Sequence, residues 1–546
     1  MPVKQTYQLL ALLLFAGAVL FRSPVARAQG RGRRPLRPAA TRPAPQPPAT
    51  PPAPAPAPIS KQEEAKEEKP VVTHHQITVR GRALNYTATA ALMPISDDAG
   101  TLEAHMFYIA YTLDGARPAS GRPLTFCFNG GPGSSSVWLQ LGAIGPRRVT
   151  LTSDGHLPPP PFHLQDNQDT WLDQTDLVFI DPVGTGYSRS VKPEFNARFW
   201  SVQGDLQSVG EFIRLYLTRY ERWGSPLFLA GESYGTTRAA GLSGYLMSQG
   251  IALNGIVLVS TVLNLQTLSF APGNELPYDL FVPTYATSAW YHKKLAPDLE
   301  NEPLDQFAAE VVHWDESVYA PALAEGDQLS GATRESVVNQ MARYTGLPKA
   351  YLDRANLRVT GSDFRKELLL DQNRVVGRYD ARLTGIDRPG VSAQAGVDPS
   401  DTAVNAPFTE AFNNYVRSEL NYKTDVPYHI LDYNVNAHWS WQNAPGPGGR
   451  TGYPGYANVA PSLRSALVDN PYLRVMVAEG YFDLATPFYE VEYTIDHLQL
   501  EPEYQEHIIQ HHYPSGHMIY INSASRDQLR QDVRAFMQEC LGGTNG

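Results

Sequence analysis

The chain has 546 residues, of which 42% are hydrophobic, and a formal net charge of -10. This length allows a large core, or a core with an inserted second domain. Nucleic acid is excluded as an expected partner, because a phosphate-binding surface needs clustered lysines and arginines, and the sequence after the N-terminal region has no such cluster.

The first residues have the pattern of an export signal. Lys4 supplies a positive charge, residues 9–20 form an apolar run that is short for a membrane span, and residues 26–28 (ARA) are typical of a cleavage site. We therefore expect a cleavable signal over residues 1–28 and a secreted or periplasmic mature protein. An uncleaved membrane anchor is the alternative.

Residues 29–70 begin rich in arginine and continue rich in proline and alanine. Such a composition cannot bury a core and favours an extended path, so we predict a disordered linker between the signal and the folded part. A tether to cell-wall or envelope material is an alternative role for this segment.

The chain has two cysteines, Cys127 and Cys540. An exported protein can form a disulfide. Cys127, however, lies in an apolar run typical of a buried strand, and two isolated cysteines do not make a disulfide framework. We therefore predict two free thiols and no cysteine-based metal site.

The folded part is predicted to begin near residue 71 with an antiparallel layer, because residues 76–92 and 104–113 alternate in polarity and are rich in β-forming residues. Short apolar strands then alternate with helices, which indicates a mostly parallel central sheet flanked by helices on both faces. The predicted strands are residues 123–128, 176–180, 226–230, 255–259, 473–478 and 506–511, and the predicted helices are 201–223, 236–248 and 525–541.

This alternation stops between residues 265 and 440. The sequence there indicates helices and loops without a clear buried strand, so we predict an inserted, largely helical cap. The α/β core would then be discontinuous, with one part over residues 71–264 and the other over residues 441–546.

Residues 231–235 form a Gly-x-Ser-x-Gly pentapeptide (GESYG). The pattern is weak alone, but here it follows a predicted apolar strand and opens a predicted helix, as in the nucleophile elbow of α/β-hydrolases. We therefore predict an α/β-hydrolase fold with Ser233 as the nucleophile. A serine that only caps the helix is the alternative.

A serine nucleophile needs a base and an orienting acid, and in this fold class the chain order is Ser, acid, His. Asp483 follows one predicted strand and His517 the next, so both fall at the sheet edge where α/β active sites form. His511 and His512 belong to the end of a strand rather than to a loop. The sequence predicts the triad Ser233, Asp483 and His517, whose chemistry needs no metal or cofactor.

A glycine-rich segment, residues 129–133 (NGGPG), follows the strand predicted to lie beside the nucleophile strand. Such a loop can turn a backbone N–H toward the substrate oxygen, and the N–H after the nucleophile is the second donor. We assign the oxyanion hole to Gly131 and Tyr234. An ordinary Gly-Pro turn is the alternative.

Together these motifs resemble the serine carboxypeptidase family, the carboxypeptidase Y-like group. The resemblance covers the α/β core, about residues 73–264 and 440–546, and implies release of C-terminal amino acids from peptides through an acyl-enzyme. The motifs that carry it are residues 129–136 (NGGPGSSS), 181–187 (DPVGTGY), 231–235 (GESYG), Asp483 and 516–518 (GHM).

The resemblance also implies a site for the free α-carboxylate of a peptide, formed by Asn129, the adjoining Gly130 and Glu232. A glutamate beside a bound carboxylate must be protonated, because two anions repel, so activity is expected to favour acid pH. Met518 would line the pocket for the leaving amino acid, and core packing is the alternative role for this side chain.

The chain departs from the usual family pattern in three respects. Ser134 stands where many members have cysteine, residues 236–237 are Thr-Thr where Ala-Gly is common, and the usual disulfides are missing, as in a bacterial-type member. We expect a secreted serine carboxypeptidase that acts on peptides with a free C-terminus. An esterase or acyltransferase with the same triad, or a non-catalytic envelope-binding protein, is the alternative.

Overall fold

The structure is a computed structural model that describes residues 69–115, 121–387, 396–441 and 455–542. They fall within the second of the two units into which the chain divides, Lys66–Gly546. The predicted export signal and the predicted linker as far as residue 68 lie outside the described residues. Among the helices that are described, none is long and apolar enough to cross a membrane.

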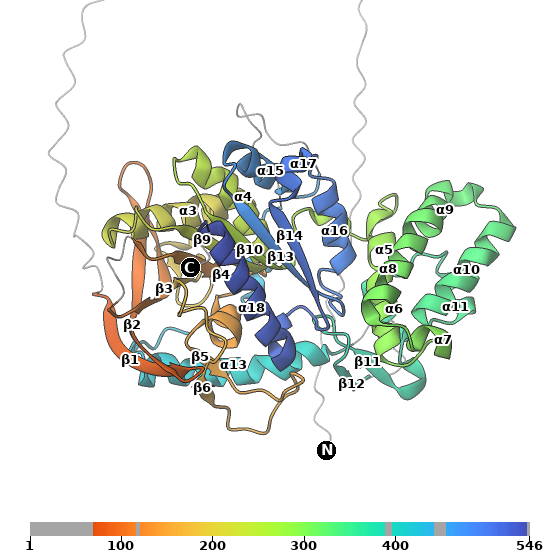
Figure 1. Cartoon of the computed structure of the whole chain (residues 1–546), viewed down its shortest axis with the longest axis horizontal. Helices are drawn as coiled ribbons and strands as arrows, with labels where there is room; N and C mark the ends of the chain where they lie inside the picture. The colour runs from red at the N-terminus through yellow and green to blue at the C-terminus, as the bar shows by residue number, and fades with distance from the viewer. Residues whose placement is uncertain (1–68, 116–120, 388–395, 442–454, 543–546) are drawn as a thin grey trace, which may run out of the picture. The chain divides into compact units, whose positions relative to one another are not determined.

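A ten-stranded sheet forms the centre of the described chain (Figure 1). Strands β1, β2, β3 and β7 pair antiparallel, whereas β7, β4, β9, β10, β13 and β14 pair parallel, which confirms the predicted mostly parallel sheet. β8 (Arg189–Ser190) adds to β3, and β5 (Arg147–Val149) and β6 (Leu164–Asp166) form a separate pair. The spatial order is β1 (Val71–Val79), β2 (Arg82–Ser96), β3 (Leu102–Leu113), β7 (Asp176–Ile180), β4 (Leu124–Phe128), β9 (Leu227–Ser233), β10 (Gly255–Thr261), β13 (Arg474–Gly480) and β14 (Ile508–Tyr513).

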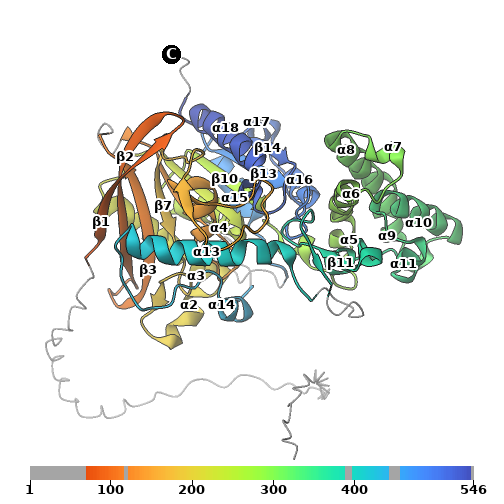
Figure 2. The same ribbon diagram turned by 90° about the horizontal axis from the view of Figure 1, so that it is seen from below.

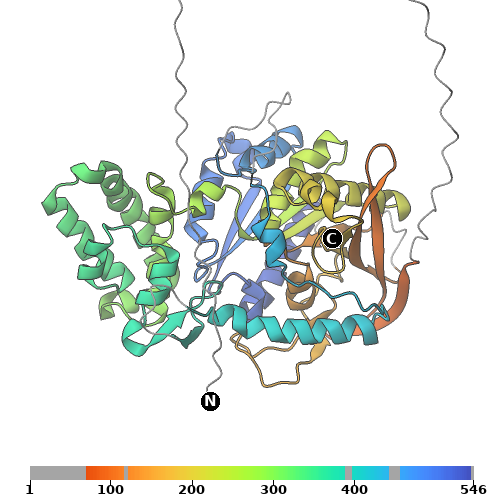
Figure 3. The same cartoon turned by 180° about the vertical axis from the view of Figure 1, so that it is seen from behind.

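Helices cover both faces of this sheet, so successive side chains of a parallel strand enter different cores. On β4, Phe126 packs in one hydrophobic cluster and Cys127 in the other. This double burial explains the continuous apolar runs of the parallel strands. α13 (Pro399–Ser418) contacts both β5 and β12 (Thr384–Ile386). It extends from near β11 (Arg374–Val376) toward the side of β1 (Figure 2), and Figure 3 shows the same long helix from behind. One face carries α13 (Pro399–Ser418) and α18 (Ser523–Cys540), and the other carries α3 (Val202–Arg219), α4 (Tyr234–Ser248), α15 (Ala460–Asp469) and α16 (Phe488–Asp496).

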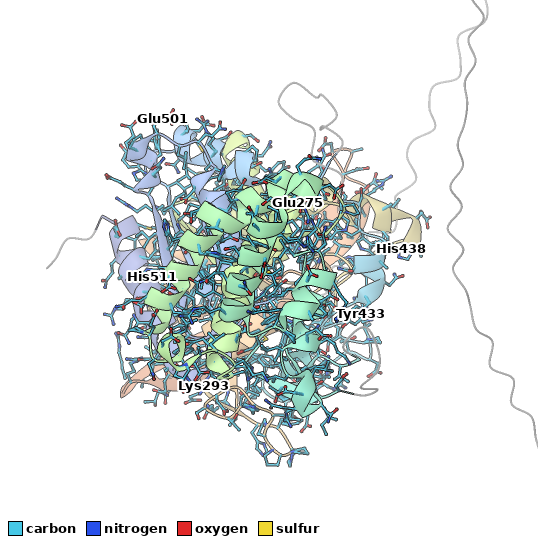
Figure 4. All side chains as sticks on the ribbon, turned by 90° about the vertical axis from the view of Figure 1, so that its right-hand side faces the viewer. Glu275, Lys293, Tyr433, His438, Glu501 and His511 are labelled. Atoms are coloured by element: carbon cyan, nitrogen blue, oxygen red, sulfur yellow. The ribbon has the colours of Figure 1, made fainter. Side chains whose placement is uncertain are left out.

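A set of helices between β10 and α13 packs around its own hydrophobic cluster, to which Phe482 and Leu484 also contribute. They lie together beside α16, on the opposite side of the sheet from β1 (Figure 1). Figure 4 faces them and labels Glu275 and Lys293, which bracket α5 and α6 in the chain. These helices are α5 (Leu276–Leu280), α6 (Val282–Tyr291), α7 (Pro297–Glu300), α8 (Leu304–Trp314), α9 (Ala320–Glu325), α10 (Gly331–Thr345), α11 (Lys349–Arg354) and α12 (Gly361–Glu367).

The domain boundaries expected at residues 265 and 440 stay predictions. α13 falls between them in the chain and yet packs with the sheet residues rather than with the neighbouring helices. The remaining short elements are α1 (Val137–Leu139), α2 (Asn196–Phe199), α14 (Tyr433–Ala437), α17 (Pro502–Gln505), η2 (Gln140–Ile144), η3 (Pro193–Phe195), η4 (Leu265–Leu268), η5 (Asp315–Tyr319), η6 (Gly326–Gln328), η7 (Leu370–Gln372) and η8 (Ile519–Ile521).

Two details differ from the sequence prediction. The single strand expected over residues 76–92 is a hairpin, in which β1 and β2 join through Arg80 and Gly81. Both have positive φ, 47° and 81°, as a two-residue hairpin turn requires, and Arg-Gly is a weaker signal for this turn than Asn-Gly. The segment expected to have no clear buried strand contains the short antiparallel pair β11 (Arg374–Val376) and β12 (Thr384–Ile386). Cys127 and Cys540 are both unpaired.

A buried ion pair joins the two helices that flank the nucleophile strand. Arg238 of α4 donates to Asp205 of α3 at 2.8 Å, and the two side chains are 1% and 2% exposed. A second guanidinium N–H donates to the carbonyl oxygen of Asn129 at 2.6 Å, which ties the loop after β4 to α4.

Arg238→Met is therefore expected to destabilise the fold strongly, because it leaves the Asp205 carboxylate buried without its partner. The expected loss is about 3–5 kcal/mol in the free energy of unfolding, measured by urea denaturation. The control is Arg214→Met, which removes the exposed pair of Arg214 with Glu211 and should cost about 0–1 kcal/mol. Equal losses in the two variants would contradict the importance of the buried pair.

Candidate functional site

Ser233 lies where β9 meets α4, and the chain turns sharply there. Its backbone angles, φ 60° and ψ -132°, fall outside the regions that residues with a side chain ordinarily adopt. The Ser233 side chain makes no capping hydrogen bond to α4, so the alternative of a helix-capping serine lacks its defining contact. The strand, the strained serine and the helix have the geometry of a nucleophile elbow.

A cavity of about 310 Å³ lies beyond the C-terminal ends of β4, β9, β10, β13 and β14. Active sites of α/β proteins form at this edge of the sheet, because the loops of successive parallel strands meet there. Most of the residues predicted from the sequence are brought together on its wall, namely Asn129, Gly130, Gly131, Glu232, Ser233, Tyr234, His517 and Met518.

Asp483, the remaining predicted residue, is fully buried and contacts His517. The Asp483 Oδ2 atom lies 2.6 Å from the His517 Nδ1 atom. Because Nδ1 is engaged with the carboxylate, Nε2 is the ring nitrogen left for a group on the cavity side. Burial lowers the pKa of His517, but the charge of Asp483 and its hydrogen bond outweigh this effect and hold that pKa above its ordinary value.

The Asp483 carboxylate is further held by the first residues after its turn. The backbone N–H groups of Ala485 and Thr486 donate to Oδ1 at 2.7 and 3.1 Å, and the Thr486 hydroxyl donates to Oδ2 at 2.7 Å. These donors replace the water that a buried anion loses. The Thr486 Oγ1 atom also lies 3.2 Å from His517 Nδ1, so one threonine contacts two of the three predicted triad members, Asp483 and His517.

The predicted acid, Asp483, and the predicted base, His517, are both held by one segment that joins β11 to β12. This segment makes backbone hydrogen bonds to both sides of Asp483 and to His517 itself, so the two loops keep a fixed relation. The three bonds are Ala381 N–H to the Phe482 oxygen (2.9 Å), Leu484 N–H to the Arg378 oxygen (3.0 Å) and His517 N–H to the Tyr379 oxygen (2.6 Å).

The glycine-rich loop passes very close to the start of α4. A Cβ atom on Gly130 would lie 2.3 Å from the backbone nitrogen of Tyr234, so only glycine fits there. Gly131 has φ 102°, a conformation that favours glycine, and it lines the same cavity as Tyr234. The loop and the helix N-terminus therefore bring backbone donors to one wall, as an oxyanion hole requires.

Glu232 is a buried carboxyl group on the wall of this cavity. Burial raises its pKa to about 7, against the opposing effects of the His517 charge and of hydrogen bonds from Tyr520 and Asn129. The side-chain oxygen of Asn129 accepts a hydrogen bond from the Leu139 N–H at 3.0 Å, which leaves its NH₂ group to donate. A carboxyl group whose pKa is raised by burial and an amide thus lie beside the predicted nucleophile.

Met518 is mostly buried, lines the cavity and belongs to the same hydrophobic cluster as α13, so its two predicted roles both stay predictions. His511 and His512 lie on β14 and face other carboxylates. His511 Nδ1 is 3.9 Å from Asp532, and His512 Nε2 is 3.0 Å from Glu492. Within the described residues, no group of histidine, cysteine, aspartate and glutamate side chains is arranged to hold a metal ion.

Several side chains of the site have no motif in the sequence. Tyr520 and Thr486 contact predicted residues, and Trp138, Arg378 and Trp441 line the cavity from other parts of the chain. Thr486 follows Asp483 by three residues, so a search for donors near the acid could have found it. The others come from loops and from the short helices α1 and η8, whose positions in space the sequence alone does not give.

The profile of the serine carboxypeptidase family matches residues 92–519 of the chain. Serine carboxypeptidase-like 36 of Arabidopsis thaliana is 31% identical over 170 residues, which are 30% of this chain and 33% of that protein. Pheromone-processing carboxypeptidase KEX1 of Saccharomyces cerevisiae is 33% identical over 146 residues, which are 26% of this chain and 19% of that protein. The matched segments thus span a third or less of these relatives' length.

Among solved structures, the chain is similar to KEX1(delta)p, a prohormone-processing carboxypeptidase from Saccharomyces cerevisiae. The TM-score is 0.51 at 17% sequence identity, and the match covers 83% of this chain and 91% of that chain. At this identity the likeness concerns the fold, and it agrees with the α/β-hydrolase architecture described above.

Asp483→Asn is expected to lower the pKa of His517, because the carboxylate charge is what keeps it raised against burial. We expect a fall of about 1–3 pH units, followed by NMR of histidine-labelled protein. As the control, Glu492→Gln changes the carboxylate that faces His512 and should leave the titration of His517 unchanged. A His517 that titrated alike in Asp483→Asn and in the wild type would contradict the inferred pairing.

Proposed function

The chain belongs to the serine carboxypeptidase family, and on this premise we propose that it releases C-terminal amino acids from peptides through an acyl-enzyme. One observation carries the proposal beyond a general hydrolase. A buried carboxyl group with a pKa of about 7, Glu232, shares one cavity with Ser233 and His517. A simple esterase needs no such group, whereas a peptide's free carboxylate needs hydrogen-bond donors, and a carboxyl group can act as one only while it carries its proton.

In the proposed first step, Ser233 attacks the carbonyl carbon of the last peptide bond. His517 takes the serine proton on Nε2 and passes it to the leaving amino group, so the peptide bond breaks and Ser233 becomes acylated. Asp483 fixes the imidazole tautomer and stabilises its positive charge, a role that the 2.6 Å contact supports. In the second step, water activated by His517 hydrolyses the ester and restores the serine.

The oxyanion formed in both steps would accept hydrogen bonds from the backbone N–H groups of Gly131 and Tyr234. Fixed donors stabilise a developing negative charge more than mobile water does, because they need no reorganisation during the reaction. The N-terminus of α4 adds a favourable dipole at the same place.

The leaving residue's α-carboxylate would be bound by Asn129, Gly130 and the protonated form of Glu232. Below a pH of about 7, Glu232 carries its proton and can donate to the substrate; above it, two anions would face each other. Peptide binding is therefore proposed to weaken as the pH rises through that value, and Met518 would border the leaving side chain.

We propose that the enzyme is exported, since the first 28 residues have the pattern of a cleavable signal, and that it is a bacterial-type member that works without the disulfides usual in the family. The free state of Cys127 and Cys540 supports the second point.

Ser233→Ala is expected to abolish release of the C-terminal residue from an N-blocked dipeptide, with a loss of about 10⁴-fold or more in kcat. A fluorophosphonate probe should label the wild type and not this variant. The control is Ser243→Ala, which removes a buried hydroxyl from α4, the helix that follows Ser233. This variant should keep both peptide release and labelling by the probe. Full release of the C-terminal residue by Ser233→Ala would overturn the mechanism. If the wild type turned over simple esters but released no amino acid, the result would favour an esterase. A wild type that the probe did not label would favour a binding protein.

Glu232→Gln is expected to remove the alkaline loss of peptide binding, because glutamine stays neutral at every pH. In the wild type, kcat/KM for a dipeptide should fall as the pH rises through about 7, whereas kcat/KM for an ester without a carboxylate should not follow this fall. The control is Glu490→Gln, since Glu490 is another buried carboxyl, with a pKa of about 8, but lies outside the cavity. An unchanged peptide profile in Glu232→Gln would overturn the proposed carboxylate site.

A further inference from the structure

Tyr520 lies in η8, three residues after His517, and its side chain is fully buried. Its hydroxyl group donates a hydrogen bond to the Glu232 Oε2 atom at 2.6 Å. Burial, followed by the nearby Glu232 charge, raises the pKa of Tyr520 well above its ordinary value, so the phenol keeps its proton and acts as the donor. No step of the proposed mechanism has so far used this residue.

The ring of Tyr520 has little freedom to move. A Cβ atom on residue 142 would lie 2.4 Å from the ring, so Gly142 provides the space that the ring occupies. The backbone of Tyr520 is held by Arg526, whose guanidinium donates to the Tyr520 carbonyl oxygen at 2.9 Å. Arg526 is itself paired with Asp169 at 2.8 Å. The hydroxyl is therefore presented to Glu232 from a fixed position.

A neutral carboxyl group has one protonated oxygen and one that only accepts. Since Oε2 already accepts a strong hydrogen bond from Tyr520, the proton of neutral Glu232 is favoured on Oε1. We infer that Tyr520 is a positioning residue that keeps this proton on Oε1, the oxygen left for the substrate's carboxylate, and that it sets the pH range of peptide binding. This inference rests on the proposed carboxylate-binding role of Glu232.

The direction of the pH effect follows from the groups that face Glu232. Burial and the Asp483 charge favour the neutral form, whereas the His517 charge and the hydrogen bonds from Tyr520 and Asn129 favour the anion. Removing the phenol hydroxyl takes away one of the contacts that stabilise the anion. Glu232 would then stay protonated to a higher pH, and peptide binding would persist further into the alkaline range.

The test is the pH profile of Tyr520→Phe, which keeps the ring and its packing. The readout is kcat/KM for an N-blocked dipeptide divided by kcat/KM for an ester without a carboxylate, because this ratio cancels the shared titration of His517. The midpoint of its alkaline fall should move up by about one pH unit, and the dipeptide KM at pH 5 should rise about threefold or more as the proton loses its fixed oxygen. An unmoved or lowered midpoint overturns the inference.

Tyr513→Phe is the matched control, because it removes a similar tyrosine–carboxylate hydrogen bond, to Asp532 at 2.8 Å, outside the cavity. It should leave the ratio unchanged. The double variant Glu232→Gln with Tyr520→Phe should behave like Glu232→Gln alone in its pH profile, since no ionisable carboxyl remains for Tyr520 to influence. A pH profile of the double variant that differed from that of Glu232→Gln would also contradict the inference.

If Tyr520→Phe does not fold, 3-fluorotyrosine at position 520 provides a second test. The fluorine makes the phenol a stronger donor without removing it, so the midpoint should move down rather than up; an upward or absent change overturns the inference.

A failure of the proposed function can be told apart from a failure of this inference. If the proposed function were wrong, the wild type would release no C-terminal residue, or Glu232→Gln would keep the wild-type pH profile. The failure of the present inference leaves both of those results intact and changes only the Tyr520 variants.

Discussion

A buried carboxylate imposes the constraint on which the arrangement of this site depends. Asp483 is fully buried, and an anion without water must find donors in the protein. Here the donors come from the turn that follows it and from His517, which lies in the loop after the next strand. The segment between β11 and β12 then holds both loops by backbone hydrogen bonds. One electrostatic requirement thus fixes the relation between three separate parts of the chain.

The parallel sheet makes this convergence possible. The loops after β4, β9, β13 and β14 all leave the same edge, and each carries part of the cavity wall. The strained conformation of Ser233 can be held there because β9 is buried on both faces and α4 packs against α3 through the pair of Arg238 with Asp205. The core therefore stabilises a backbone that would be unfavourable in an isolated peptide.

Two buried carboxyl groups near His517 have opposite environments. Asp483 accepts hydrogen bonds from Ala485 and Thr486 and contacts the imidazole of His517. For Glu232, the His517 charge and the hydrogen bonds from Tyr520 and Asn129 only partly offset the effect of burial, which raises its pKa to about 7. Carboxyl groups with such different hydrogen-bond surroundings can take different roles in one site. Such a division suits a reaction that needs a charged orienting acid and a neutral hydrogen-bond donor in one cavity.

The sequence by itself was sufficient to predict the mostly parallel sheet with its helical layers and to choose Ser233, Asp483 and His517 as candidates. Those predictions depend on local signals, namely short apolar runs, glycines at a turn and the order of strand ends. Each of these signals is carried by residues that are close together in the chain. The catalytic roles stay a prediction, but Ser233 and His517 do lie on one cavity, and the buried Asp483 contacts His517.

The Arg80–Gly81 hairpin was missed because Arg-Gly is a weak turn signal, and the β11–β12 pair was missed because its strands are short. Tyr520 could not be found at all, since its partner Glu232 lies 288 residues earlier in the chain. Only the tertiary structure decides such a contact, because it depends on how the two loops pack and on the space that Gly142 leaves for the ring.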